Sequence, residues 1–214
     1  MSRLQHRPVQ VVDKSQRNRV RIAQEAARLM SENGIRDFHH AKRKAAARLG
    51  VVDTQSLPRN GEIEQALREH QRLFLADSQP QWLRARRQAA VAAMTFLAPF
   101  APRLVGAVLE GTADAHSAVC LHVFCDDLDA VTLFLREQGV PLEVQNRRLR
   151  GNHGQFDDYP ALLFSADNLP FDLTVLPRSA LRQPPVDTLT DRAMRRASLA
   201  QVRQLLDEPA AAVL

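Results

Sequence analysis

Apolar residues recur at helical spacing through the first hundred positions of the chain. Val20, Ala23, Ala27 and Met30 share one face of a predicted helix. By the same criterion four helices are predicted, over about 15–33, 37–50, 61–75 and 81–97. Pro80 separates the third helix from the fourth. Residues 1–80 are therefore predicted to form an all-helical region, which precedes a second domain at 81–214.

After Pro102 the pattern changes to short apolar runs that are typical of strands. Strands are predicted within 103–112, 118–124, 142–149, 161–165 and 170–176. A helix from about 126 to 138 interrupts them, and Ser198 begins a final helix. This order predicts a mixed sheet with helices on one side, and hence an α+β fold.

Gly111-Thr112 and Ser117 lie in the break between the first two runs, and Asp172 lies in the last run. This arrangement over about 90–177 resembles the nucleotidyltransferase fold of the polymerase-beta-like superfamily. In that fold a strand ends in Gly-Ser, the next strand carries Ser-Asp-x-Asp, and a later strand bears a third carboxylate. The resemblance implies that Gly111, Thr112, Ser117 and His122 bind a nucleotide and that Asp172 is the candidate catalytic residue.

Two departures from the family pattern concern the metal. Ala118 and Cys120 occupy the positions of the two metal-binding aspartates. Mg²⁺ prefers hard oxygen ligands, whereas alanine offers none and cysteine offers a soft one. Mg²⁺ with nucleotide is the only cofactor that the resemblance implies, and no metal site is predicted. A transition metal on Cys120, His122 and Asp172, or a Cys120 nucleophile beside His122, is less favoured than a Cys120 that packs as a small hydrophobe.

Charge is distributed unevenly along the chain. Residues 1–100 hold 18 Lys and Arg against 9 Asp and Glu, whereas residues 101–214 hold 11 against 15. A basic first half favours a polyanionic partner such as nucleic acid. The alternative is arginine-rich codon usage in a GC-rich genome.

A row of basic side chains follows one face of the predicted helix 37–50. His40, Lys44 and Arg48 are spaced four apart, with Arg43 and His39 beside them. Such a row is suited to contacts with nucleic-acid phosphates, and the alternative is a solvated helix face.

Arg195 and Arg196 come just before Ser198, where the last predicted helix begins. The positive end of a helix dipole attracts anions, so these arginines are a second candidate surface for nucleic acid. The alternative is a basic surface loop.

The first two predicted helices resemble the start of a helix-turn-helix domain of the tetracycline-repressor type. The similar residues run from Ala26 to Gly34 and from Ala45 to Val51. That family implies a recognition helix directly after Val51, where residues 52–58 have the composition of a loop. No DNA-reading residue is inferred from this resemblance.

Cys120 and Cys125 lie on or beside one predicted strand, too far apart there to form a disulfide. Reduced thiols, no signal-peptide pattern over Met1–Arg7 and no apolar run of membrane-spanning length predict a cytoplasmic protein without a membrane partner. The leading hypothesis is a non-catalytic or weakly catalytic nucleotidyltransferase-like protein that binds nucleic acid, RNA or DNA, or nucleotide. The alternatives are an active transferase with an unusual metal set and a helix-turn-helix regulator with a C-terminal sensor domain.

Overall fold

A computed structural model describes residues 14–35, 37–75, 78–151, 154–187 and 191–207. The chain divides into two compact units, Met1–His70 and Gln71–Leu214. This boundary lies within the third helix and precedes the 80/81 boundary inferred from the sequence. Residues 1–13, from which the absence of a signal peptide was inferred, are outside the described part.

The first unit is helical, as the 3.6-residue periodicity predicted. It is built from α1 (Lys14–Asn33), α2 (Phe38–Arg48), the short 3₁₀ helix η1 (Thr54–Ser56) and the first part of α3 (Asn60–Phe74). Ile22, Leu29, Ala41, Ala45 and Ile63 are fully buried where these helices meet. Ala23, Ala27 and Met30, predicted as the apolar face of the first helix, belong to this core, whereas Val20, assigned to the same face, is 47% exposed.

The segment after Val51 forms no regular α-helix of the kind that the helix-turn-helix resemblance implied. The carboxylate of Asp53 accepts hydrogen bonds from the backbone N–H of Gln55, at 2.9 Å, and from the hydroxyl of Ser56, at 2.8 Å. These bonds hold the chain in the single 3₁₀ turn η1. The next α-helix, α3, begins only at Asn60.

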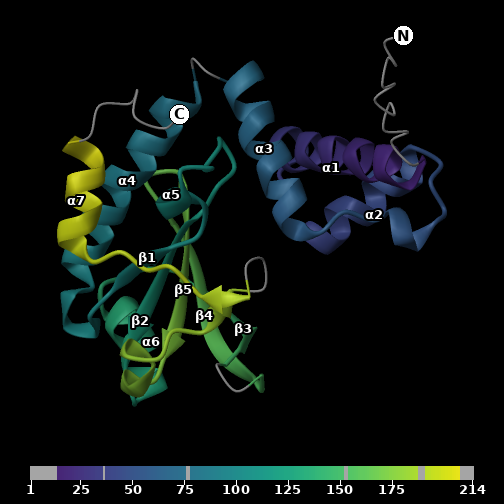
Figure 1. The fold of residues 1–214 in the computed structure, drawn as a ribbon. Helices are drawn as coiled ribbons and strands as arrows, with labels where there is room; N and C mark the ends of the chain where they lie inside the picture. Colours follow the sequence, from purple (N-terminus) through teal and green to yellow (C-terminus); the bar gives the residue numbers. More distant parts are fainter. Residues whose placement is uncertain (1–13, 36, 76–77, 152–153, 188–190, 208–214) are drawn as a thin grey trace, which may run out of the picture. The chain divides into compact units, whose positions relative to one another are not determined.

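The second unit combines helices with one mixed sheet (Figure 1). Its remaining helices are α4 (Gln79–Phe96), η2 (Ala98–Phe100), α5 (Ala107–Glu110), α6 (Leu128–Glu137), η3 (Arg178–Leu181) and α7 (Leu199–Asp207). Its strands are β1 (Arg103–Val105), β2 (Val119–Phe124), β3 (Glu143–Arg150), β4 (Phe156–Ala166), β5 (Leu169–Leu176), β6 (Val186–Asp187) and β7 (Arg192–Ala193). The α+β class predicted from the sequence is confirmed.

The strands lie in the order β1-β2-β5-β4-β3-β6-β7, and the sheet curls into a half-barrel. Among the described strands, only β2 and β5 run parallel, and every other neighbouring pair is antiparallel. Such a parallel pair requires a long connection, here the segment that contains α6 and the β3–β4 hairpin.

One face of the sheet packs against helices. Leu121, Val123, Leu173 and Val175 alternate along β2 and β5 and are fully buried against side chains of α4, α5, α6 and α7. Alternate residues of a strand point to opposite faces, so Cys120, His122, Asp172 and Thr174 lie on the other face, called the inner face below. The helices thus cover one side of the sheet, as predicted.

A backbone bridge closes part of the half-barrel. The N–H and C=O of Leu104, in the edge strand β1, exchange two hydrogen bonds of 2.9 Å with Ala197. The described residues between Pro177 and Ala197 form η3, β6 and β7 and cross the sheet (Figure 1, yellow). Part of the inner face is buried as a result.

Arginines of α4 hold the C-terminal end of α7. Arg87 donates from Nη1 to the carbonyl of Leu205 at 2.9 Å, and Arg84 donates to that of Leu206 at 3.3 Å. The last carbonyls of a helix have no partner within the helix and carry the negative end of its dipole. These two cations therefore dock α7 onto α4.

Within the described residues, no helix has both the length and the hydropathy required to cross a membrane.

We expect Leu173→Ala to destabilise the second unit by about 2–5 kcal/mol, because it opens a cavity between the sheet and its helices. Val144→Ala is the control, since Val144 is 52% exposed on β3; its cost should stay within about 0.5 kcal/mol. Trp82 of α4 is the single tryptophan, so its fluorescence during urea unfolding reports on this unit. Equal losses in both variants would contradict the assigned core.

Candidate functional site

The register of the parallel strands brings the candidate residues of β2 and β5 together. Cys120 pairs with Asp172, and His122 pairs with Thr174. On the other side of β2, Arg103 pairs with His122 and Val105 pairs with Cys120. The inner face therefore contains both Asp172 and His122, two of the residues inferred from the sequence.

The glycine beside this pair is Gly106, and not Gly111. Strand β1 ends at Val105, and Gly106 has a φ of 71°, which turns the chain into the short helix α5. A Cβ on Gly106 would lie 3.6 Å from that of Cys120. The expectation that 103–112 is one strand ending in Gly111-Thr112 is wrong, because Gly106 interrupts it after three residues.

Gly111 and Thr112 instead belong to the loop that precedes β2. Gly111 ends α5 with a φ of 80°. The backbone N–H of Thr112 donates to Ala107 at 3.0 Å, and its carbonyl accepts from the side chain of Gln71 at 2.8 Å. These hydrogen bonds use the backbone to anchor the loop.

Ser117 is buried inside the same loop, where its hydroxyl is used structurally. Its Oγ donates to Asp114 Oδ1 at 2.9 Å and accepts from the backbone N–H of Asp114 at 2.9 Å. The carbonyl of Ser117 accepts from Nε of the buried Arg86 at 2.6 Å. Ser117 therefore fixes the entry of the chain into β2.

Asp172 binds a cation of the protein itself. Its Oδ2 accepts a hydrogen bond from Arg147 Nη2, on β3, at 2.7 Å. Its Oδ1 is buried and has no hydrogen-bond partner among the described residues. One oxygen of this carboxylate is thus neutralised by an arginine, and the other is enclosed without a donor.

His122 is 3% exposed. Its Nδ1 is also buried, with no hydrogen-bond partner in the described part of the chain. Burial lowers the pKa of His122 to about 3, and the nearby positive charges of Arg196 and Arg147 contribute to the shift. The imidazole is therefore neutral at physiological pH and adds no charge to the inner face.

Arg196 reaches the inner face from the segment after β7. Its guanidinium lies 5.0 Å from the ring centroid of Phe124, and its Nη1 donates to the carbonyl of Ala180 at 2.7 Å. Within the described structure, Nε and Nη2 are buried without a partner. Burial, followed by the charge of Arg103, lowers the pKa of Arg196 to about 10, so the side chain still carries its charge at neutral pH.

These residues make the centre of the inner face positive. Three arginines, Arg103, Arg147 and Arg196, surround Asp172 and the neutral His122, whereas the two other carboxylates that the strand register places on this face, Glu143 and Asp157, are exposed. Arginine forks bind carboxylate and phosphate oxygens with directed hydrogen bonds. The arrangement is therefore suited to an anion with several oxygens.

The same residues do not fit Mg²⁺. The register partner of Asp172 on β2 is Cys120, which is no carboxylate, and Asp172 Oδ2 already accepts a hydrogen bond from Arg147. Among the residues that the structure describes, no group of three or more His, Cys, Asp or Glu is placed to hold a metal ion. Cys120, His122 and Asp172 thus share a face without forming a metal site.

Arg195 and Arg196 separate instead of forming one anion site at the start of α7. Arg195 forms an ion pair of 2.7 Å with Glu110 and is largely exposed. The N-terminus of α7 is capped by its own residues, since Ser198 and Gln201 exchange backbone-to-side-chain hydrogen bonds of 2.8 and 3.4 Å.

The basic row on α2 faces solvent in the first unit. His39, His40, Arg43 and Lys44 are exposed, opposite the buried Ala41 and Ala45. Arg48 is also exposed, but its Nη1 forms an ion pair of 3.2 Å with Glu25 of α1. Four members of the row therefore present a continuous polar and basic surface.

Sequence reasoning missed Arg103 and Arg147 as site residues. Arg103 is the first residue of a predicted strand, and Arg147 stands between the polar Asn146 and Arg148, so no alternation with apolar residues distinguished Arg147. Their convergence depends on pairing between strands that are far apart in sequence. Gly106 lies in the middle of the first apolar run, and its position there was the only local signal for the turn.

No protein-family model matches the chain, and neither a curated protein nor a solved structure was found to match it.

The neutral state of His122 predicts a particular dependence of stability on pH. The unfolded chain protonates this histidine near pH 6.5, whereas the folded chain does so only near pH 3. Between these values the unfolded state binds the extra proton, so stability should fall by about 1.4 kcal/mol per pH unit as the pH falls. Urea unfolding of the parent at pH 6.5 and pH 5 measures this.

His122→Gln is expected to lose that part of the pH dependence, and the imidazole signals of the folded parent should not titrate near neutrality. A midpoint close to 6.5 for His122 by NMR, or an unchanged pH dependence in the variant, would contradict the assigned environment.

Proposed function

We propose that the second unit binds a nucleotide, or a related phosphate-bearing ligand, on the inner face without a divalent metal and with little or no catalysis. The proposal depends chiefly on one observation. His122 Nδ1, Asp172 Oδ1 and two guanidinium nitrogens of Arg196 are buried without hydrogen-bond partners in the described structure. They belong to residues that lie on, or reach, the same face.

Buried polar atoms without partners are costly. Each such group costs about 1–3 kcal/mol, and most native structures satisfy them. Phosphate oxygens would accept from Nε and Nη2 of Arg196, and a ligand hydroxyl or amine would suit Asp172 Oδ1 or His122 Nδ1. A bound ligand with both kinds of group would therefore recover part of this cost.

The arginines supply the charge that metal ions supply in related chemistry. Nucleotidyl transfer normally uses two Mg²⁺ ions to hold a triphosphate and activate the attacking group. Here Ala118 and Cys120 stand at the positions of the metal ligands in the resemblance, and Arg147 donates a hydrogen bond to Asp172 Oδ2. The resemblance to the nucleotidyltransferase fold suggests a nucleotide as the ligand, and these substitutions favour binding without transfer.

The main rival is an active nucleotidyltransferase that uses an unusual metal set around Asp172. Another is a regulator in which the second unit senses a small molecule. No disulfide joins Cys120 and Cys125, which fits the reducing cytosol proposed for all three. The metal requirement of binding separates the first rival from the proposal.

Arg196→Gln and Arg147→Gln should each weaken ATP binding by about tenfold or more, because each removes charge-assisted hydrogen bonds of about 1.5–3 kcal/mol. Calorimetric titration of the full chain, first in EDTA and then in Mg²⁺, measures the effect. The parent should bind in EDTA at least as tightly as in Mg²⁺, since the metal competes for the triphosphate.

Each of these two arginines has an adjacent arginine whose side chain lies elsewhere and which serves as a matched control. Arg195→Gln removes the partner of Glu110, and Arg148→Gln removes an exposed guanidinium that lies over Phe156. Both should change affinity by no more than about twofold. Equal losses in all four would indicate nonspecific attraction, and binding that requires Mg²⁺ and is lost in Asp172→Asn would favour the active transferase.

A second candidate function concerns the helical unit alone. The row His39, His40, Arg43 and Lys44 is exposed on α2. Regularly spaced cations on a helix suit sequence-independent binding to phosphates. We propose that this surface binds the backbone of RNA or DNA.

Replacing Arg43 and Lys44 together by alanine should reduce the slope of log affinity against log salt by about two, because each side chain neutralises roughly one phosphate. Fluorescence anisotropy with duplexes of different sequence measures this, and affinity should fall by a similar factor for each. Arg28→Ala with Arg68→Ala also removes two charges from this unit, but these arginines are paired with neighbouring glutamates. An equal change in this control, or an unchanged slope in the first variant, would mean that the row is only a solvated face.

A further inference from the structure

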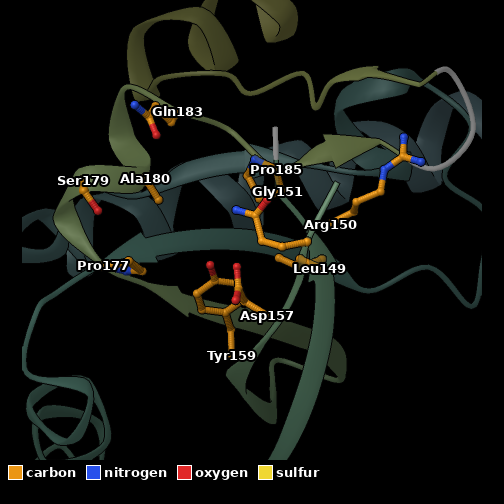
Figure 2. A pocket seen from close by; sticks show the side chains of 11 residues that line it. Leu149, Arg150, Gly151, Asp157, Tyr159, Pro177, Ser179, Ala180, Gln183 and Pro185 are labelled. Atoms are coloured by element: carbon orange, nitrogen blue, oxygen red, sulfur yellow. The ribbon is translucent and has the colours of Figure 1, made fainter. Parts of the chain in front are cut away.

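A pocket opens beside the arginines, where the β3–β4 hairpin faces the segment after Pro177 (Figure 2). Tyr159 and Asp157 point into it from β4, and Pro177 and Gln183 line the opposite side. Its volume is ≈ 110 Å³. One water molecule needs roughly 10–15 Å³ of such volume. The space is therefore suited to more than a single water.

The pocket is connected to the proposed phosphate site through two residues. The carbonyl of Ala180, which lines the pocket, accepts the hydrogen bond from Arg196. Tyr159 pairs across the strands with Arg147, so both side chains lie on the inner face. A ligand whose phosphate binds these arginines would have its other end near the pocket.

The walls favour a flat ring. The phenol of Tyr159, the side chain of Leu149 and the rings of Pro177 and Pro185 present apolar surfaces. Polar groups interrupt these surfaces at Gln183, an amide, and at Asp157, a carboxylate. A planar heterocycle that carries N–H donors satisfies both kinds of surface.

The side chains of Asp157 and Tyr159 interact through a hydrogen bond. Burial raises the pKa of Tyr159, and the charge of Asp157 and the hydrogen bond to it raise that pKa further. The phenol thus remains protonated and donates to Asp157, which keeps lone pairs for a second donor. An amino-bearing ring would supply that donor, and an oxygen at the same position would be repelled.

We propose that this pocket holds the base of the bound nucleotide and that Asp157 selects bases with an exocyclic amino group. The proposal rests on the proposed function, because the arginines hold the phosphate. Adenine, guanine and cytosine would therefore be preferred to uracil. Tyr159 provides the stacking surface, which contributes about 1–3 kcal/mol where bases stack on aromatic side chains.

The test compares ATP, CTP, GTP, UTP and inorganic tripolyphosphate by calorimetric titration of the full chain in EDTA. The parent should bind ATP about tenfold more tightly than tripolyphosphate, and UTP more weakly than the other three nucleotides. Tyr159→Ala should lower the affinity for ATP to that for tripolyphosphate and leave the tripolyphosphate affinity unchanged. Gln183→Ala should also weaken ATP binding. Because Gln183 is exposed on the opposite side of the pocket, a loss in this variant cannot be attributed to a folding defect of the kind that Tyr159→Ala could cause.

Asp157→Asn should reduce the discrimination against UTP. Asp158→Asn should not, since Asp158 is the next residue of β4 and is exposed on the other face. If tripolyphosphate binds as tightly as all four nucleotides, the base pocket is overturned and the phosphate site is left intact. Failure of every probe to bind, or binding that is unaffected by Arg196→Gln, would overturn both.

Discussion

The structure of the second unit depends on the pairing of β2 with β5 in one parallel register. This register places Leu121 and Val123 beside Leu173 and Val175 under the helices, and it leaves His122 and Asp172 on the opposite face. A slip of one residue would exchange the two faces and expose the core. The burial of apolar side chains thus also determines which residues can meet in the site.

The second constraint is the closure of the half-barrel. The bridge between Leu104 and Ala197 draws the last segment across the inner face and carries Arg196 over Phe124. Closure buries His122, which is therefore neutral, and encloses polar atoms without partners among the described residues.

Local patterns predicted much of the fold but only part of the site. The helices followed from the 3.6-residue period. Asp172 and His122 were selected through the family resemblance, and the strand register places both on the inner face. Val108 and Leu109 were misread as strand, since two apolar residues give no period and Gly106 redirects the chain only through its backbone. The approach of Arg147 and Arg196 to β2 arises from long-range pairing, which no local pattern contains.

The central claim is that arginines take the place of metal ions in holding a phosphate on the inner face. A crystal structure of the full chain with ATP in the presence of EDTA tests it most directly. The account predicts triphosphate oxygens within hydrogen-bond distance of Arg196 Nε or Nη2 and of the guanidinium of Arg147. An empty inner face with ATP bound elsewhere, or a triphosphate that enters only with Mg²⁺ coordinated by Asp172, would contradict it.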